Sequence, residues 1–137
     1  MTRQAGFLDT GDDLLRLTSA SCRLDESGAL NVDGDGPDVV VGIYGMRFLA
    51  TDYAGLVDLG WRYDGLDARE ADTFAECGIQ VRGEALHVVA ANCQCLGWSP
   101  EKRTLTLRFE IEAMSETHAD PLACELSMAC LVETAAG

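Results

Sequence analysis

The residues from Thr104 to Glu112 alternate strictly between polar and apolar side chains, and this alternation restricts the fold more than any other feature. The apolar members are Leu105, Leu107, Phe109 and Ile111. Successive side chains of a β-strand point to opposite faces, so the pattern predicts a strand with one buried face and one face in water. A helix would instead repeat its apolar positions every three to four residues.

A second alternating segment follows close behind. From Leu122 to Val132 the even positions are apolar, whereas the odd positions include Glu125. The intervening stretch is polar and ends in Asp120–Pro121, a dipeptide that favours a turn. The two segments therefore predict a long antiparallel hairpin near the C-terminus.

Shorter segments of the same kind occupy most of the preceding chain. We expect strands over 14–24, 28–32, 39–49, 57–63, 79–84 and 85–96. The last of these is almost continuously apolar, which is typical of a strand covered on both faces. Seven or eight strands joined by short turns predict an all-β fold, an antiparallel β-sandwich or barrel with at most one short helix. We expect one domain over 1–137, with 1–11 as a flexible N-terminal segment.

An alternative layout depends on a possible helix. Phe48, Leu49, Tyr53, Leu56 and Val57 fit a period of 3.6 residues. A helix near 46–57 wrapped by a curved antiparallel sheet would give an α+β, hotdog-like fold. Residues 67–76 also contain good helix formers but lack an apolar stripe.

Charge excludes several classes of partner. The chain has 10 Lys and Arg against 23 Asp and Glu, a formal net charge of −13. Nucleic acids and anionic membranes are bound through clustered basic residues, so we expect neither as a partner. A basic protein is the partner that the charge favours. No apolar stretch reaches the length of a membrane span or of a signal-peptide core, so we expect a soluble, cytoplasmic protein.

One acidic stretch is a candidate cation site. Asp33, Asp35 and Asp38 lie within six residues that also contain two glycines, and hard cations such as calcium prefer several oxygen ligands around a tight turn. The stretch does not match the EF-hand pattern, because its twelfth position is Tyr44 instead of glutamate. Asp and Gly are also common in ordinary turns, and that interpretation remains open.

The six cysteines predict reduced thiols in a cytoplasmic protein. Cys93 and Cys95 lie two residues apart on one face of a predicted strand, near the outer limit for bridging. We expect them to be buried thiols, with a metal or redox role as the alternative. We expect His87 to be a buried histidine, and His118 could form a local acid/base group with its acidic neighbours.

Two tryptophans are candidate binding residues. Trp61 shares a strand face with Tyr63, and Trp98 ends a strand just before Ser99–Pro100. Aromatic rings exposed on a sheet would form a platform for carbohydrate or protein, whereas burial would make them part of the core.

No nucleophile elbow, zinc-protease motif, phosphate-binding loop or complete dinucleotide fingerprint occurs, and no cofactor is expected. The leading hypothesis is a non-catalytic protein-interaction domain with an acidic surface. The alternatives are a hotdog-like enzyme or small-ligand binder acting as a homodimer, and a weak metal-binding domain. A homo-oligomer could also form by pairing of exposed strand edges.

Overall fold

The structure is a computed structural model, and it describes residues 5–11, 13–25, 28–48, 52–64, 76–115 and 121–132. The all-β prediction is confirmed, because the chain forms strands with one short helix. The elements are β1 (Gly6–Asp9), β2 (Leu14–Leu17), β3 (Ser19–Leu24), β4 (Ala29–Asp35), β5 (Val39–Arg47), α1 (Tyr53–Leu56), β6 (Gly60–Asp64), β7 (Glu76–Val81), β8 (Glu84–Ser99), β9 (Thr104–Met114) and β10 (Leu122–Val132).

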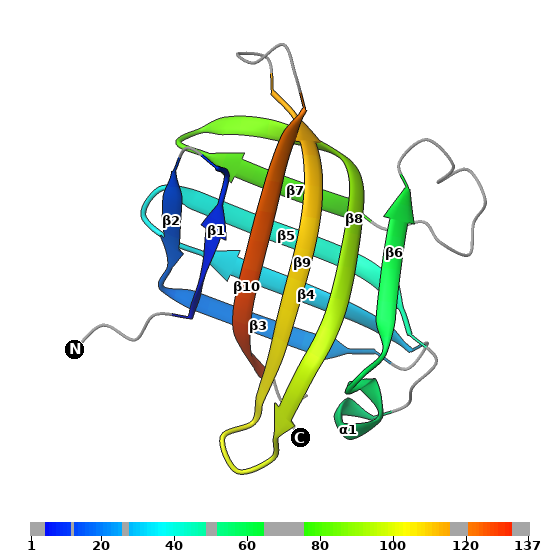
Figure 1. Cartoon of the computed structure of the whole chain (residues 1–137). Helices are drawn as coiled ribbons and strands as arrows, with labels where there is room; N and C mark the ends of the chain where they lie inside the picture. Colours follow the sequence, from blue (N-terminus) through cyan, green and yellow to red (C-terminus); the bar gives the residue numbers. More distant parts are fainter. Residues whose placement is uncertain are drawn as a thin grey trace.

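Seven of the strands close into a barrel (Figure 1). Antiparallel pairs run in the order β3, β4, β5, β7, β8, β9 and β10. A parallel pair between β10 and β3 closes the ring, with Leu131 opposite Ser21 and Val132 opposite Cys22. A closed sheet has few free edges, which limits edge-to-edge aggregation.

Three further strands extend this barrel. β1 pairs with β10 alongside the short β10–β3 contact, and β2 continues outward from β1. β6 pairs with the middle of β8, over residues 90–94, whereas β7 pairs with its beginning, over residues 84–87. The long strand β8 therefore joins two neighbours in succession, and it carries β6 as an outer strand beside the barrel (Figure 1).

The predicted C-terminal hairpin is confirmed. β9 and β10 pair antiparallel along their length, with Phe109 opposite Leu126. The apolar positions of both alternating segments point inward and are buried, while the residues between them face outward. The alternation of apolar and polar residues thus gives each strand one face in the core and one face in solvent.

Side chains fill the barrel interior. The largest fully buried side chains come from five strands of the ring and from the added strands β1 and β2, and include Leu8, Leu17, Leu30, Ile43, Met46, Ile79, Leu105, Leu107, Phe109, Leu126 and Met128. Gly34 of β4 also faces this core, where an added Cβ would lie 2.8 Å from the Cε of Met128. A methyl group at that position would therefore require the Met128 side chain to shift.

The acidic stretch 33–38 is not one loop, as its composition had suggested. Asp33, Gly34 and Asp35 belong to β4, and the β4–β5 turn occupies only residues 36–38. Gly34 faces the core in this strand. The carbonyl oxygen of Asp35 accepts a hydrogen bond of 2.8 Å from the amide of Thr18. Tertiary pairing here overrides the turn preference of Asp and Gly.

Two predicted strands each contain a break. The segment 14–24 divides at Thr18 into β2 and β3. The segment 79–84 contains the β7–β8 turn at Arg82 and Gly83, whose φ angles of 51° and 83° are both in the left-handed region. Two such residues form a hairpin turn that matches the twist of the flanking strands.

The expectation that 85–96 is covered on both faces is wrong. Burial alternates along this part of β8, with Cys93 and Cys95 inward and Asn92, Gln94 and Leu96 outward. His87 is likewise exposed and not buried as expected. The outer face of this strand borders water because the described strands form one sheet, and no second sheet among them packs against it.

The N-terminal and helical expectations also differ from the structure. Gly6–Asp9, within the segment expected to be flexible, forms β1 between β2 and β10. The helix α1 has only four residues, begins at the N-cap Asp52 and lies at one end of the barrel (Figure 1). No long helix is therefore wrapped by the sheet in the described part of 46–57, and the hotdog-like alternative is not the fold. The candidate helix at 67–76 lies almost entirely outside the described residues.

Candidate functional site

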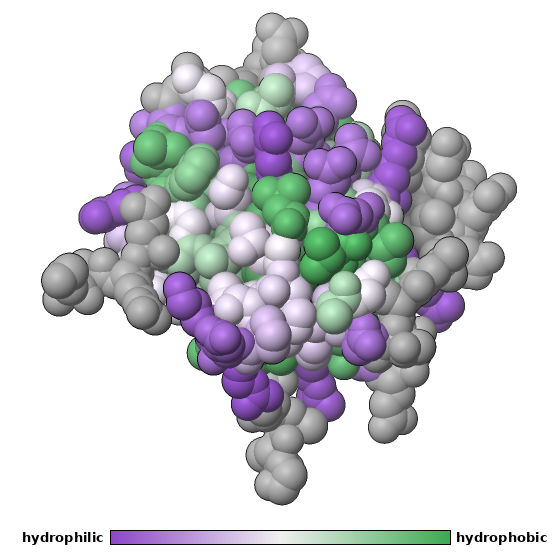
Figure 2. Space-filling model, turned by 60° about the horizontal axis from the view of Figure 1, so that its bottom comes forward, coloured by the Kyte–Doolittle hydropathy of each residue, from purple (hydrophilic) through white to green (hydrophobic). Residues whose placement is uncertain are grey.

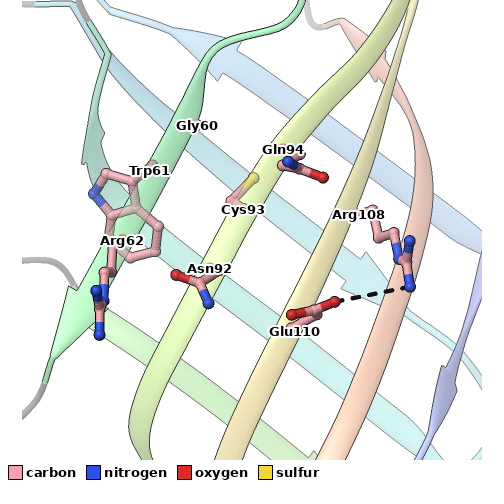
Figure 3. Close-up of a pocket in the computed structure, with 8 residues that line it drawn as sticks. All are labelled: Gly60, Trp61, Arg62, Asn92, Cys93, Gln94, Arg108 and Glu110. Carbon is pink, nitrogen blue, oxygen red and sulfur yellow. Dashed lines mark ion pairs between the residues drawn. The ribbon is translucent and has the colours of Figure 1, made fainter.

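A polar pocket lies on the outer face of β6, β8 and β9 (Figure 3). It has a volume of about 330 Å³. Its lining consists of Gly60, Trp61, Arg62, Asn92, Cys93, Gln94, Arg108 and Glu110. The polar members point outward from three adjacent strands, so a ligand would meet amide, guanidinium and carboxylate groups together.

Strand register places these side chains in two rows. Arg62 is opposite Asn92, and Asn92 is opposite Glu110. In the next row, Gln94 lies between Gly60 and Arg108. Residues two apart on a strand share a face, so the two rows form one polar surface. The missing side chain at Gly60 leaves space beside Gln94.

The first row continues as a line of carboxylates across the barrel wall. Glu110 is opposite Glu125 of β10, and Glu125 is opposite Asp9 of β1. Directly opposed like charges destabilise a sheet. Arg108, in the neighbouring row, offsets the repulsion: it places its Nε 2.9 Å from Glu125 Oε1 and its Nη2 3.8 Å from Glu110 Oε1. Figure 3 shows the Arg108–Glu110 pair. We call Asp9, Glu110 and Glu125 the carboxylate row.

Arg62 stands at the opposite side of the pocket from Arg108. It is exposed and forms no ion pair with any residue that the structure describes. Its guanidinium can therefore donate hydrogen bonds to an incoming acceptor without first losing an ion pair to a described residue. Asn92 and Gln94 between the two arginines can each donate and accept.

Cys93 and Trp61 form the inner side of the pocket. Both are buried, and they face each other in the β6–β8 pair. A hydrogen bond with Cys95, followed by burial, raises the pKa of the Cys93 thiol well above its ordinary value. The thiol therefore stays protonated near neutral pH and is a poor nucleophile. The outward groups of this pocket are suited to binding through hydrogen bonds and ion pairs.

The predicted aromatic platform is not formed by Trp61, which is only 7% exposed and belongs to the core. Trp98, at the end of β8, is half-buried and stacks on Tyr53 of α1 with ring centroids 5.1 Å apart. The Tyr53 hydroxyl in turn accepts a hydrogen bond of 2.9 Å from the amide of Leu24. Trp98 thus helps to attach α1 to the end of the barrel.

The three carboxylates of the candidate cation site are not gathered around one point. Asp33 and Asp35 project from β4, Asp33 accepts a hydrogen bond from the Tyr44 hydroxyl, and Asp38 lies in the following turn. Across residues 5–11, 13–25, 28–48, 52–64, 76–115 and 121–132, no group of three His, Cys, Asp or Glu side chains is placed to hold a metal ion.

The prediction of buried thiols is confirmed for the five cysteines whose side chains the structure describes. Cys22, Cys93, Cys95, Cys124 and Cys130 are all buried and free. Only the backbone of Cys77 is described, and His118 lies outside the described residues.

Apolar groups also reach the surface. Figure 2 shows them at the lower end of the barrel as separate patches bordered by hydrophilic residues. Among the residues that the structure describes, the large apolar side chains that are more than half exposed are Leu14, Leu96 and Leu131. Homo-oligomer formation remains a prediction.

Sequence reasoning missed the polar residues of the pocket and the carboxylate row. The sequence signal for these residues is the two-residue spacing between Asn92 and Gln94, and between Arg108 and Glu110. Each pair marks one face of one strand. Only the register of β6, β8, β9, β10 and β1 shows that these faces adjoin.

Comparison of the chain with models of protein families, with curated proteins and with solved structures gave no match. No described helix has both the length and the apolar character that crossing a membrane requires.

Proposed function

We propose that this protein is a non-catalytic interaction domain that binds a basic polypeptide segment of a partner protein across the outer face of β6, β8, β9 and β10. The bound segment would lay its main chain over the pocket and its basic side chains along the carboxylate row. This proposal follows from the chemistry of the outward side chains on those strands.

The observation that carries the proposal is the carboxylate row itself. Glu110, Glu125 and Asp9 are directly opposed on adjacent strands, with Arg108 as their neighbouring cation. Such a row costs stability in the free protein, and a cationic partner would relieve that cost on binding. Arginine and lysine side chains supply the matching charge.

The pocket offers a complementary surface for the main chain of the same segment. Asn92 and Gln94 each present a donor and an acceptor, the two groups that a peptide unit needs. The volume of about 330 Å³ is at the lower end of the usual range for ligand pockets, and it can accept one side chain. Arg62 can additionally bind a main-chain carbonyl or an acidic neighbour in the segment.

Fluorescence anisotropy with a labelled arginine-rich peptide tests the proposal. We expect binding that weakens as salt is added, because the paired charges are exposed to solvent. The double variant Glu110→Gln/Glu125→Gln should bind about tenfold more weakly, which corresponds to about 1.4 kcal/mol. A glutamate-rich peptide of the same length should not bind.

A matched variant distinguishes the effect of the carboxylate row on peptide affinity from the effect of net charge. Asp35→Asn/Asp38→Asn removes the same number of negative charges from β4 and its turn, on other strands of the barrel. Its affinity should stay within about twofold of the unaltered protein. Equal losses in the two double variants would show that overall charge alone attracts the peptide, and the proposed site would then be wrong.

A further inference from the structure

A second pocket lies on the outer face of β3, β4 and β5, separated from the first pocket by intervening strands of the barrel wall. Its volume is about 390 Å³, and its lining consists of Ser21, Cys22, Arg23, Asn31, Asp33 and Tyr44. These residues come from three strands that are neighbours in the sheet, and none of them belongs to the site described above.

A β-bulge shapes this second pocket. Leu30 is opposite Met46 and Val32 is opposite Ile43, so Tyr44 and Gly45 together oppose the single residue Asn31. Gly45 takes the left-handed conformation, with φ at 85°, and its amide donates a hydrogen bond of 2.8 Å to Asn31 Oδ1. Bulges of this kind re-aim side chains, and here the side chain affected is Tyr44.

Tyr44 lies across the position where Gly42 has no side chain. A Cβ added at Gly42 would be 2.9 Å from the tyrosine hydroxyl oxygen and 3.2 Å from two ring carbons. From this position the hydroxyl donates a hydrogen bond to Asp33 Oδ1. Tyr44 remains 39% exposed, so the ring is held against the sheet and still accessible. Tyr44 therefore has the accessible aromatic ring that the sequence analysis expected of Trp61 or Trp98.

The polar groups around the ring form a balanced set. Asp33 supplies acceptor oxygens, Arg23 supplies donors, and Ser21, opposite Asp33, can do both. Asn31 already uses its carbonyl oxygen for Gly45, which leaves its amino group as the donor for the pocket. The lining contains one cation and one anion, so it favours neither anionic nor cationic ligands by net charge.

We propose that this second pocket, formed by Ser21, Arg23, Asn31, Asp33 and Tyr44, binds a neutral carbohydrate. A pyranose ring has C–H groups on its faces that pack against an aromatic ring. Each of its hydroxyls can donate to Asp33 while accepting from Arg23 or Asn31. An accessible aromatic ring next to a few fixed polar groups is the general form of a small-ligand site.

Chemical-shift titration of the isotopically labelled protein tests this site directly. The probes are glucose, galactose, mannose and N-acetylglucosamine, together with their β-linked disaccharides. We expect at least one of them to shift the amide resonances of residues 21–23, 31–33 and 42–45, and to leave those of residues 92–94 and 108–110 in place. The charged analogues glucuronate and glucosamine should bind more weakly than the parent sugar.

Substitutions then assign the contacts. Tyr44→Ala, which removes the ring, should weaken binding about tenfold or more, equivalent to about 1.4 kcal/mol. Tyr44→Phe keeps the ring and loses only the hydroxyl, so its loss should be smaller. Asn92→Ala, in the first pocket, should bind the sugar unchanged. The spectrum of each variant without ligand is the control for its folding.

Three results would overturn the proposal. One is that none of the sugars shifts the resonances of the second pocket. Another is that Tyr44→Ala binds as tightly as the unaltered protein. The third is that glucuronate or glucosamine binds more tightly than the neutral parent, which would assign the pocket to a charged ligand. These results concern residues that play no part in the peptide-binding proposal, so either proposal can fail alone.

Discussion

The ring of Trp98, at the end of β8, stacks on Tyr53 of α1 with centroids 5.1 Å apart and ring planes at 22° to each other. Tyr53 also accepts a hydrogen bond from the amide of Leu24, the last residue of β3. The two aromatic residues thereby connect three elements at one end of the barrel. The helix, which is too short to be stable alone, is held by these contacts.

Trp98→Ala should therefore destabilise the protein. Loss of the stacked ring and its buried area should lower the free energy of unfolding by about 2–3 kcal/mol, less than for a fully buried tryptophan. Urea unfolding followed by circular dichroism measures the change. Tyr53→Phe keeps the ring pair and removes only the acceptor for Leu24, so its cost should be about 1 kcal/mol. An unchanged midpoint for Trp98→Ala would show that the stack does not stabilise the barrel end.

Arg108 should matter for stability because it is the cation beside the carboxylate row. Its side chain is 44% exposed, so solvent screening limits the effect. We expect Arg108→Met to lower the free energy of unfolding by about 0.5–1 kcal/mol at low salt, and by less at high salt. Measurement by urea unfolding at two ionic strengths checks both parts.

Glu110→Gln provides the complementary test. Added to Arg108→Met, it removes one of the repelling charges and should restore part of the lost stability. A double variant less stable than Arg108→Met alone would show that Glu110 does not repel Glu125 in the folded protein. The same substitution contributes to weaker peptide binding under the proposed function, so stability and binding should change in opposite directions.

Buried thiols should make stability fall at alkaline pH. A hydrogen bond with Cys22, followed by burial, raises the pKa of Cys130 well above its ordinary value. Cys93 is raised in the same direction by Cys95 and burial. A raised pKa in the folded state means that the folded protein holds the proton more tightly. The stability contribution is thus complete below the unfolded pKa of about 8.5 and is lost as pH rises above it.

We expect the free energy of unfolding to fall between pH 8 and pH 10 by up to about 1.4 kcal/mol per pH unit for each such thiol. Cys130→Ala should have a lower stability at pH 7 because of the cavity, and a shallower decline above pH 8.5. The comparison reports Cys130 together with Cys22 and Cys93, with which it interacts, whereas titrating groups remote from Cys130 contribute equally to both proteins and cancel. Parallel declines would contradict the role of Cys130.

A methyl group at Gly42 should displace the Tyr44 ring. In Gly42→Ala the new Cβ would meet the Tyr44 hydroxyl oxygen at 2.9 Å, forcing the ring away from Asp33. We expect a net loss of about 1 kcal/mol in the free energy of unfolding.

Gly97→Ala is the matched control for this substitution. It lies in β8, where nothing is within 4 Å of an added Cβ, so it should be neutral or slightly stabilising. The difference between the two midpoints in thermal unfolding measures the clash. If both variants unfold at the same temperature, Tyr44 is free to move and the second pocket is not preformed.

The alternation of apolar and polar residues explains why the strands near the C-terminus were predicted correctly. Leu105 to Ile111 and Leu122 to Val132 became β9 and β10 with the expected buried faces. Predictions failed where a contact with a distant residue decided the outcome. Asp33 and Asp35 became part of a strand because they pair with β3 and β5, and because the amide of Thr18 donates a hydrogen bond to the carbonyl oxygen of Asp35.

By itself, the sequence determined the strand-rich architecture, the buried faces of β9 and β10 and the excess of negative charge. Only the tertiary structure decided that the strands close into a barrel, which outward residues form pockets, and which carboxylates oppose one another. Asp9, Glu110 and Glu125 are distant in the chain and meet because of the register between β1, β9 and β10. Alternation depends on neighbouring residues, whereas register depends on backbone pairing and core packing between segments far apart.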